Sequence, residues 1–329
     1  MIKSILLSEA KMSRRMVRHL AQTNQVLRNG APVFLTARAV LGDEIYVMLP
    51  KEDSSVEPEQ MRLDIRYEDE EFIVINKPAG ILTHPTAREK TGSLLAGVRA
   101  YLGGSVVPHC VHRLDRQTSG LVILAKHAHA HQLLDRALRQ GQVHRVYHAL
   151  ALGFPQELQT PFLHTPEWQT IDLPIAQDPK KPSRRIFSPD GQRAVTHYRI
   201  VAAQHGVGLL QIVLETGKTH QIRLHLASIG HPLLGDGDYN MSYFLSNRPE
   251  KSTAERMENG GLVRHALHGT QLGWRHPVSG QFHVVTAEPP SDIQQGWSNL
   301  TGKMVDWSFL ANDVSGLQRV EMLSSNLLR

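Results

Sequence analysis

The sequence predicts an α+β protein: a mixed, mostly antiparallel central sheet with flanking helices, preceded by a small separate domain. Two observations predict this class. Short apolar runs of strand length follow one another in hairpin-like pairs, with only a few helical patterns between them. Residues 1–50 are enriched in positive charge, and a polar segment without periodicity at 51–61, predicted to be a linker, separates them from the rest.

The composition is that of a globular protein with a mild excess of positive charge. With 329 residues, 41% of them hydrophobic, the chain can form one large domain and a small accessory one. A net charge of +5 favours a polyanionic partner, but only weakly. The single cysteine, Cys110, excludes an intrachain disulfide and a multi-cysteine zinc site. No apolar run is long enough to cross a membrane and no signal peptide is recognisable, so we expect a cytoplasmic protein, acting as a monomer.

The first domain is predicted to begin with a basic helix. Ser13 can cap this helix through its hydroxyl. An apolar face then follows at helical spacing, and three arginines lie near the start of the helix. The apolar residues are Met16, Val17 and Leu20, and the arginines are Arg14, Arg15 and Arg18.

A small hairpin is expected after this helix. Asn29-Gly30 marks a turn after a short strand, and 41–47 is a second turn that leads into a strand. A helix with arginines followed by a hairpin suits a module that contacts RNA phosphates, so Arg14, Arg15 and Arg18 are RNA-binding candidates. The order resembles the small RNA-binding domain of ribosomal protein S-four and of several RNA-modifying enzymes. The alternative is a capping domain with a solvated basic face.

The large domain, 62–290, is predicted to begin with buried strands and short helices. The apolar run at 72–76 predicts a buried strand, and Pro78 and Gly80 force a turn after it. A second buried strand is expected at 121–125. Further strands are predicted at 143–152, 194–201, 208–215 and 281–286, and helices at 93–102 and 128–139.

The second half of this domain is less regular. Residues 155–174 are rich in proline and predicted to form a loop, and 243–260 is predicted to be an exposed excursion. Residues 178–185 form a basic loop, which is either simply solvated or a second phosphate contact through Lys180, Lys181, Arg184 and Arg185.

A late helix and a tail complete the chain. We expect a helix capped by Thr219 that ends near Gly230, with Ile222, Leu226 and Ile229 as its apolar stripe. Residues 291–329 are predicted to be an extension of unknown role, with a helix around 317–328.

A polar turn at 112–120 stands directly before the buried strand at 121–125. It contains one carboxylate, Asp115, between Arg113 and Arg116. An ionised carboxylate against a buried strand needs a partner or a task. From the turn alone, Asp115 is equally well explained as a capping residue paired with a neighbouring arginine and as a catalyst.

The common cofactor and nucleophile motifs are missing from the sequence. His127, His129 and His131 alternate, but no HExxH pattern and no carboxylate at ligand spacing accompany them, so no metal is expected. There is no G-x-S-x-G elbow, no P-loop and no dinucleotide fingerprint. A reaction run by this chain should therefore need no cofactor, and would rest on a carboxylate, arginines and a tyrosine.

Five blocks, in order, resemble the RluA-type pseudouridine synthases. The blocks are E-D…V-I-N-K-P-A-G…H-P at 68–85, H-R-L-D…T-S-G-L at 112–121, R-V-Y-H-A-L at 145–150, T-G-K-T-H-Q-I-R-L-H with G-H-P and G-D at 216–236, and R-H-A-L-H with H-P at 264–277. They span most of 62–290, so the resemblance implies the pseudouridine synthase fold there. It also implies an RNA partner, ribosomal or transfer RNA, and no cofactor. An S-four-like module is common in this family.

The resemblance also implies catalytic roles. Asp115 would be the essential carboxylate, meeting the ribose carbon that loses its base, much as glycosidase carboxylates do. Arg223 would be its counter-ion, with a guanidinium fork able to bind a carboxylate at two points. Tyr147 would stack on the uracil and take the C5 proton.

Four further residues are expected to bind the substrate. Arg113 is the candidate to occupy the place of an extruded uridine. Leu224 would line the uracil pocket, and His112 and Thr118 belong to the same motif as Asp115. Arg145 stands where the family usually has lysine, and Lys218 where arginine is common.

Two other function classes are open to the same sequence. A non-catalytic RNA-binding protein that kept the fold would be marked by loss of Asp115, Tyr147 or Arg223, and all three are present. A nucleotide hydrolase would need a second carboxylate or a metal cluster, and the motifs supply neither.

Overall fold

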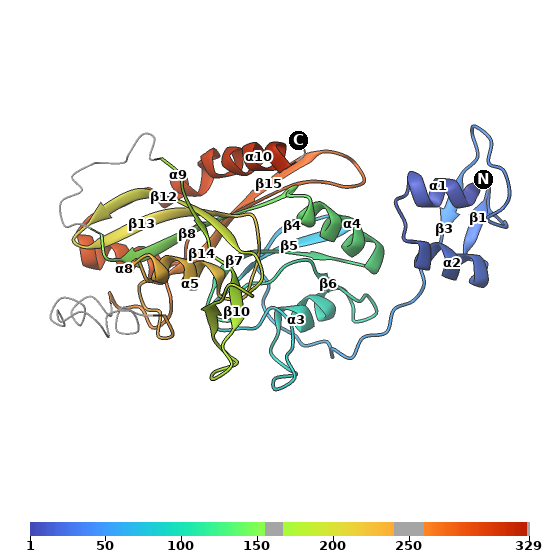
Figure 1. Cartoon of the computed structure of the whole chain (residues 1–329). Coiled ribbons are helices and arrows are strands. Elements are labelled where there is room, and N and C mark those ends of the chain that lie inside the picture. The colour runs from blue at the N-terminus through green and yellow to red at the C-terminus, as the bar shows by residue number, and fades with distance from the viewer. Residues whose placement is uncertain (155–166, 240–259, 328–329) are drawn as a thin grey trace. The chain divides into compact units, whose positions relative to one another are not determined.

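The computed structural model describes residues 1–154, 167–239 and 260–327, which form two compact units (Figure 1). The smaller unit comprises Met1–Ser55 with Ser105–Val107, and the larger unit comprises Val56–Gly104 with Pro108–Arg329. Nearly all of the excursion predicted at 243–260 lies outside the described residues, as does the first part of the loop predicted at 155–174.

The smaller unit consists of two helices and a three-stranded antiparallel sheet in the order β2-β1-β3. Ser13 caps α2 as predicted, its hydroxyl accepting a hydrogen bond from the backbone N–H of Met16 at 3.1 Å. Val17 and Leu20 are buried, whereas the arginines of α2 are exposed. The elements are α1 (Ile2–Ser8), α2 (Arg14–Thr23), β1 (Val26–Arg28), β2 (Ala31–Pro32) and β3 (Ile45–Val47).

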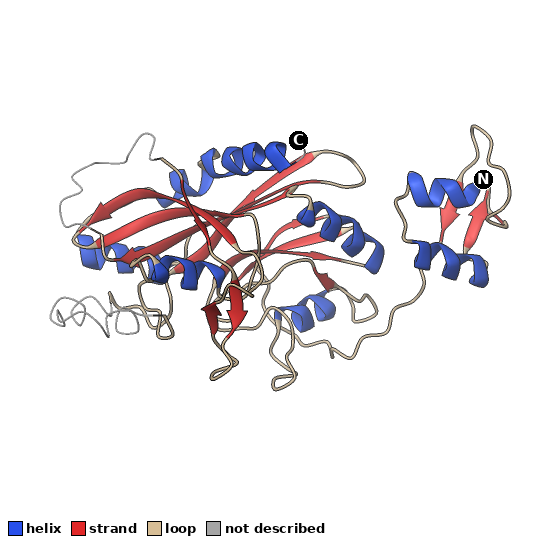
Figure 2. Ribbon diagram, in the orientation of Figure 1, coloured by secondary structure: helices blue, strands red, loops and turns tan. Residues whose placement is uncertain are grey.

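The larger unit is an α+β domain built on one large sheet (Figure 2). Within the described ranges, no helix has the length and apolar content needed to cross a membrane. The strands of the unit are β4 (Ile65–Glu68), β5 (Phe72–Lys77), β6 (His109–Cys110), β7 (Ser119–Ala125), β8 (Val143–Leu152), β9 (Gln169–Asp172), β10 (Ile175–Gln177), β11 (Arg185–Phe187), β12 (Val195–Gln204), β13 (Val207–Leu214), β14 (Leu267–Arg275) and β15 (Phe282–Thr286). Its helices are α3 (Leu94–Tyr101), α4 (Ala128–Arg139), α5 (Gln221–Ser228), α8 (Ser291–Thr301), α9 (Trp307–Asn312) and α10 (Ser315–Leu327).

The sheet is mixed and mostly antiparallel, as predicted. Its main path runs β4-β5-β7-β14-β8-β13-β12-β9, with β15 paired to β14 and β6 paired to β7. All of these pairings are antiparallel except that of β7 with β14. The central strand β8 therefore lies between β14 and β13.

Helices cover both faces of this sheet (Figure 1). Successive residues of a strand point to opposite sides, so a strand that is apolar throughout needs to be covered on both faces. Tyr147 and Ala149 of β8 belong to a core shared with α3 and α5. Val146 packs with α10, and Leu150 with α8 and α9. β8 is consequently buried along its whole length. Its odd-numbered residues 145–151 face the α3/α5 side.

The two ends of the large domain differ from the predicted boundaries. The tail at 291–329 belongs to the larger unit, because α8, α9 and α10 pack on the sheet with buried residues such as Trp297 and Trp307. The second half of the predicted linker also docks on this unit: the Glu59 N–H donates to the Ala96 carbonyl at 3.1 Å.

Two predicted loops contain strands. Residues 169–172 within the first loop form β9, which pairs with β12. The basic loop at 178–185 is the connection of a small hairpin between β10 and β11, and Arg185 is already part of β11. Both strands are short and lack the period-two apolar pattern that the prediction required.

Candidate functional site

A pocket of about 460 Å³ opens on the α3/α5 side of the sheet. Its lining comes from 110–115, from Arg145 and Tyr147 on β8, and from 214–223, the segment that joins β13 to α5. The volume lies within the usual range for small-ligand pockets. Three segments far apart in sequence thus meet at one cavity.

The turn that carries Asp115 is fixed by hydrogen bonds on both sides of this residue. The Thr83 hydroxyl accepts from the Leu114 N–H at 3.1 Å and donates to the Leu114 carbonyl at 2.8 Å. The Arg116 carbonyl accepts from the Gly80 N–H at 2.8 Å and from the Lys77 ammonium at 3.2 Å. The turn therefore holds its carboxylate in a defined place.

A close crossing of β7 and β14 brings this turn near Tyr147. Gly120 has φ +123°, and a Cβ on it would lie 2.3 Å from the Gly269 backbone nitrogen, so only glycine fits. Gly269 in turn pairs with Tyr147 across the sheet. The parallel contact of these strands thus sets the distance between the Asp115 turn and β8.

Asp115 faces a basic group from α5 and not its sequence neighbours. Its Oδ2 lies 3.8 Å from Nη1 of Arg223 and 3.9 Å from Nε2 of His220. Arg116 instead pairs with Glu89. The alternative in which Asp115 is a capping residue paired with a neighbouring arginine is therefore wrong, because its nearest cation is 108 positions away in sequence.

The two-point bond expected between Arg223 and Asp115 is also wrong. The Arg223 fork binds Asp236, with Nε to Oδ2 at 2.7 Å and Nη2 to Oδ1 at 2.8 Å, and Nη2 reaches Asp238 at 3.1 Å. Burial raises the pKa of Asp236, but the hydrogen bonds and charge of Arg223 outweigh burial and hold it below its usual range. Towards Asp115, Arg223 makes the longer approach of Nη1 at 3.8 Å.

The start of α5 differs from the predicted cap. Helix α5 begins at Gln221, after His220 in the left-handed conformation (φ 58°, ψ 16°), so Thr219 is not its cap. The Gln221 side chain closes the preceding turn, since its Oε1 accepts from the Lys218 N–H at 2.9 Å and from the Thr216 hydroxyl at 2.8 Å. In this left-handed conformation, the imidazole of His220 lines the pocket.

Leu224 does not line the pocket, contrary to the prediction. It packs with Ala227 and Tyr239 in a separate apolar cluster. Ile222 lines the pocket instead, because two residues along a helix correspond to a rotation of about 200°, so Ile222 and Leu224 point to nearly opposite sides. Ile229 is not part of a buried stripe, since it follows α5 and is 38% exposed.

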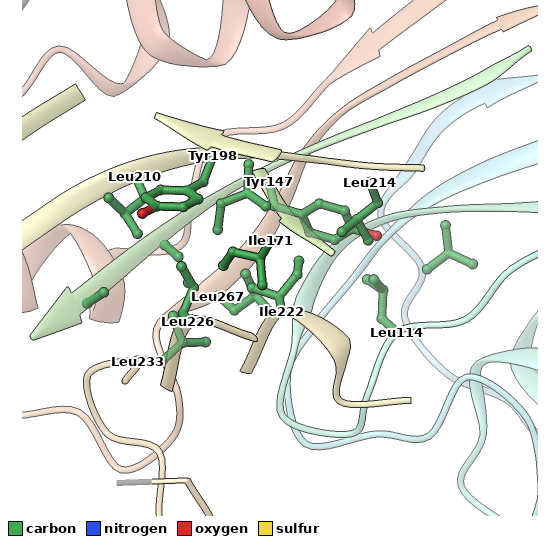
Figure 3. Close-up of a cluster of buried hydrophobic side chains, with 14 of the residues drawn as sticks. Leu114, Tyr147, Ile171, Tyr198, Leu210, Leu214, Ile222, Leu226, Leu233 and Leu267 are labelled. Atoms are coloured by element: carbon green, nitrogen blue, oxygen red, sulfur yellow. The ribbon is translucent and has the colours of Figure 1, made fainter. Parts of the chain in front are cut away.

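Tyr147 is buried in the wall of the pocket, within the core cluster that Figure 3 shows. Burial raises the pKa of its hydroxyl, and the negative charge of Asp115 acts in the same direction. The cation of Arg145, two residues earlier on the same face of β8, opposes both. Tyr147 is therefore a neutral phenol near a carboxylate and a guanidinium.

The other predicted substrate-binding residues of the Asp115 motif also line the pocket. Arg113 is exposed, with Nη1 3.4 Å from Nε2 of His84. His112 is buried, accepts from the Ile123 N–H at 3.3 Å, and has its pKa lowered to about 3 by burial and by Arg145. Thr118 contacts Nε2 of His265 at 2.7 Å.

The predicted phosphate-binding residues fall into two groups. Arg14, Arg15 and Arg18 extend from the exposed face of α2. In the β10–β11 connection Lys180 is exposed, while Lys181 lies 3.4 Å from Asp238. Arg184 donates to the Asp238 carbonyl and stacks over Tyr239, and Arg185 donates to nearby backbone carbonyls.

The alternating histidines have structural contacts. His127 caps α4, its Nδ1 accepting from the Ala130 N–H at 3.2 Å, and its Nε2 lies 2.9 Å from Glu71. Among the residues that the structure describes, no three His, Cys, Asp or Glu side chains are grouped so that they could hold a metal ion.

Three residues at the site escaped the sequence reasoning: His220, Asp236 and Asp238. The first two stand inside blocks that carried the resemblance, at 216–225 and 235–236, but their types alone gave no role. The usable signal was electrostatic. A buried arginine on α5 requires a carboxylate, and Gly-Asp-Gly-Asp at 235–238 supplies two.

Comparison with known proteins identifies the family. Residues 71–228 match the family model described as RNA pseudouridylate synthase. An uncharacterised RNA pseudouridine synthase of Bacillus subtilis, YhcT, is 38% identical over 299 residues, covering 88% of this chain and 90% of the relative. Ribosomal large subunit pseudouridine synthase D of Escherichia coli (strain K12) is 36% identical over 288 residues, covering 85% and 84% respectively.

Solved structures share the fold. The human RNA pseudouridylate synthase domain containing 1 matches with a TM-score of 0.54 at 22% identity, covering 82% of this chain and 97% of that one. The human domain containing 4 matches with the same TM-score at 24% identity, covering 72% and 92%. Because relatives above 30% identity extend over most of both chains, the chain belongs to the RluA/RluD-type RNA pseudouridine synthases, isomerases that convert uridine in RNA to pseudouridine.

Proposed function

We propose that Asp115 is the essential carboxylate of this isomerase, with Arg223 and Tyr147 as its partners, and that it acts on a specific uridine in structured RNA. The observation that carries the proposal is the meeting of these three side chains at one 460 Å³ pocket. A non-catalytic RNA-binding protein would not need to keep them together.

The reaction makes limited demands on the protein. The N1–C1′ bond of uridine breaks, the uracil turns, and a C5–C1′ bond forms. The C5 proton leaves and N1 gains a proton, so the atoms balance without a redox partner or group donor. The protein must supply a group that reacts with or stabilises the electron-poor ribose, and a residue that removes the C5 proton.

Asp115 fits the first demand by either of two routes. Its carboxylate can attack C1′ and form a covalent intermediate, or it can remove the 2′ proton of the ribose. Both routes need the ionised form beside the sugar. Arg223 Nη1 lies 3.8 Å from the carboxylate, and the polar turn holds the carboxylate in place.

Tyr147 and Arg113 fit the remaining demands. The buried Tyr147 ring offers a face on which the uracil stacks. Late in the reaction its hydroxyl oxygen accepts the C5 proton while its own proton passes to a water molecule, and the cation of Arg145 favours this step because it acts to lower the pKa of the phenol. The exposed Arg113 is placed to fill the gap that an extruded uridine leaves in the RNA. His112 and Thr118 complete the wall behind the substrate.

We further propose ribosomal RNA as the first substrate to test, ahead of transfer RNA. Relatives named ribosomal large subunit pseudouridine synthase D are 35–37% identical to the chain. The S-four-like unit would bind RNA through the exposed arginines of α2, and the β10–β11 connection would add Lys180, Lys181, Arg184 and Arg185. We expect the enzyme to act as a monomer in the cytoplasm.

One pair of variants tests the role of Asp115. We expect D115N to bind RNA with a Kd within about threefold of wild type, because the substitution is isosteric, yet to release no tritium from RNA labelled at uracil C5. D190N, an exposed aspartate in the turn before β12, is the control and should be fully active.

The same variants in cells identify the RNA. Pseudouridine mapping across all RNA of cells lacking the protein should reveal a missing site that wild type and D190N restore and D115N does not. Restoration by D115N would remove Asp115 from the mechanism. A missing site confined to transfer RNA would overturn the ribosomal assignment while leaving the chemistry intact.

A further inference from the structure

His220 is a pocket residue that the proposed chemistry does not use. It lines the cavity directly before α5, and its side chain is only 15% exposed. Its backbone is left-handed, a conformation that is uncommon for residues other than glycine, although asparagine, aspartate and histidine adopt it more often than the rest. The fold thus accepts local strain at a position where the imidazole meets Asp115.

Hydrogen bonds behind the imidazole select one of its two neutral forms. The Arg185 N–H donates to the Tyr239 hydroxyl oxygen at 2.7 Å, and the same oxygen lies 3.0 Å from Nδ1 of His220. Burial raises the pKa of Tyr239 to about 12, so its hydroxyl keeps a proton to donate. Within the described part of the chain this hydroxyl has no other acceptor than Nδ1, so Nδ1 accepts and Nε2 carries the proton.

The protonated nitrogen faces the proposed catalytic carboxylate. Nε2 lies 3.9 Å from Oδ2 of Asp115, the same oxygen that Arg223 Nη1 approaches to 3.8 Å. Contacts between catalytic groups are often this long and tighten in the complex with substrate, so we expect both distances to shorten when RNA binds. Two donors at the start of α5 thus approach the same oxygen of the Asp115 carboxylate.

We propose that His220, held as its Nε2–H form by Tyr239, is a positioning residue that orients the Asp115 carboxylate toward the target ribose. This inference rests on the proposed role of Asp115. His220 acts through that carboxylate, together with Arg223, and does not itself contact the reacting atoms.

The charges around His220 are mixed. Asp115 and Asp238 face it as anions, and Arg223 and Arg185 face it as cations. Burial lowers the pKa of His220, against the opposing effect of Asp115, so the imidazole is neutral at pH 7.5. A neutral donor orients Asp115 without forming a second ion pair that would blunt its reactivity.

Single-turnover kinetics with excess enzyme test the positioning role. H220N keeps a residue that tolerates the left-handed backbone but cannot reach Asp115, and we expect a rate about 10- to 100-fold lower with RNA affinity within about twofold. H220Q, whose longer amide reaches the position of Nε2, should recover part of the rate. An H220N rate equal to wild type would overturn the proposal.

His205 offers a matched control. It is a histidine with a left-handed backbone (φ 53°) in the exposed turn between β12 and β13. H205N should therefore react at the wild-type rate. A comparable loss in H205N would mean that the H220N effect comes from the backbone and not from the imidazole, which would contradict the proposal.

Nitrogen NMR of the full-length protein at pH 7.5 reads the tautomer directly. With histidine labelled in the ring and the signal assigned by its loss in H220N, we expect the Nε2–H form in wild type and a shift toward Nδ1–H in Y239F. The Y239F variant should react more slowly than wild type. The double variant H220N/Y239F should react at the same rate as H220N. An Nδ1–H signal in wild type would refute the hydrogen-bond chain.

The tautomer is measured without RNA and so does not depend on the identity of the catalytic carboxylate. An active D115N would remove the proposed function while the NMR result stood. Conversely, an inactive D115N with a fully active H220N would leave the proposed function intact and remove only the role of His220.

Discussion

Arg223 is shared unequally among three carboxylates. It gives Asp236 two short hydrogen bonds and Asp238 one, and approaches Asp115 only at 3.8 Å. A buried arginine needs a permanent anion, because an unpaired charge in the interior is very costly. Asp236 is that anion. Asp115 therefore stays available for the substrate, although it still lies 3.8 Å from the Arg223 guanidinium.

This division predicts a large effect for D236N. The amide removes the anion that balances Arg223, and loss of one partner of a buried ion pair typically costs about 3–5 kcal/mol. We expect the free energy of unfolding to fall by that order, measured by chemical denaturation at pH 7.5. The single-turnover rate should fall as well, because Arg223 is then free to bind Asp115 at two points.

D238N is the matched control. Its carboxylate is 37% exposed and accepts one hydrogen bond from Arg223 at 3.1 Å, so solvent screens the interaction. We expect less than about 1 kcal/mol of destabilisation. Equal losses in the two variants would show that Asp236 is not the main anchor of Arg223.

At the scale of elements, α2 carries its charges where they do not stabilise it. Arg14 and Arg15 occupy the first turn, which has no acidic residue, although the helix dipole favours anions there. Ser13 and the buried Val17 and Leu20 explain why the helix nonetheless forms. The arginines are therefore not explained by the stability of α2. Binding to an anionic partner would explain them.

We expect R14Q/R15Q/R18Q to weaken RNA binding and to reduce the slope of log Kd against log salt by about 2–3, since each phosphate contact releases about one counterion. Glutamine keeps helix propensity, so the fold should be unchanged by circular dichroism. R275Q/K303Q, which removes two exposed cations of the larger unit outside the pocket, is the comparison. An unaltered slope in the triple variant would argue against RNA contact by α2.

The elements that could be predicted from sequence are those with a strong periodic pattern or cap. β5, β7, β8 and α4 lie within a residue or two of their predicted bounds, because apolar runs and helical stripes reflect burial directly. β9 and β11 were missed, because short strands take their pairing from distant residues. Residue propensity alone predicts Thr219 as the cap, whereas His220, in the left-handed conformation, occupies the N-cap position.

The site could be predicted only in part, for the same reason. Asp115, Tyr147 and Arg223 carry recognisable motifs, and the pocket does bring them together. Which anion Arg223 binds, and whether Ile222 or Leu224 faces the cavity, depends on the rotation of α5 and on a chain segment 13 residues further on. No local pattern encodes either feature.

At the scale of the whole molecule, the larger unit buries several histidines in neutral form. Burial lowers the pKa of His112 and His268 to about 3 and that of His148 and His265 to about 4. All four tryptophans of the chain, at 168, 274, 297 and 307, also belong to this unit. Tryptophan fluorescence therefore follows the unfolding of the larger unit alone.

These histidines predict a steep loss of stability in mild acid. Their folded pKa values lie below the unfolded value of about 6.5, so the unfolded state binds more protons between about pH 4 and 6.5. The stability they contribute is complete above pH 6.5 and is lost as the pH falls, by up to about 1.4 kcal/mol per pH unit for each group.

Denaturant titrations at pH 7.5, 6.5 and 5.5 should show midpoints that drop mainly between the last two. H268N, in which asparagine replaces an imidazole that contacts Ser119, should reduce the pH slope by about one proton, whereas H205N, in an exposed turn, should leave it unchanged. A slope unaffected by H268N would mean that other groups control the acid sensitivity of the fold.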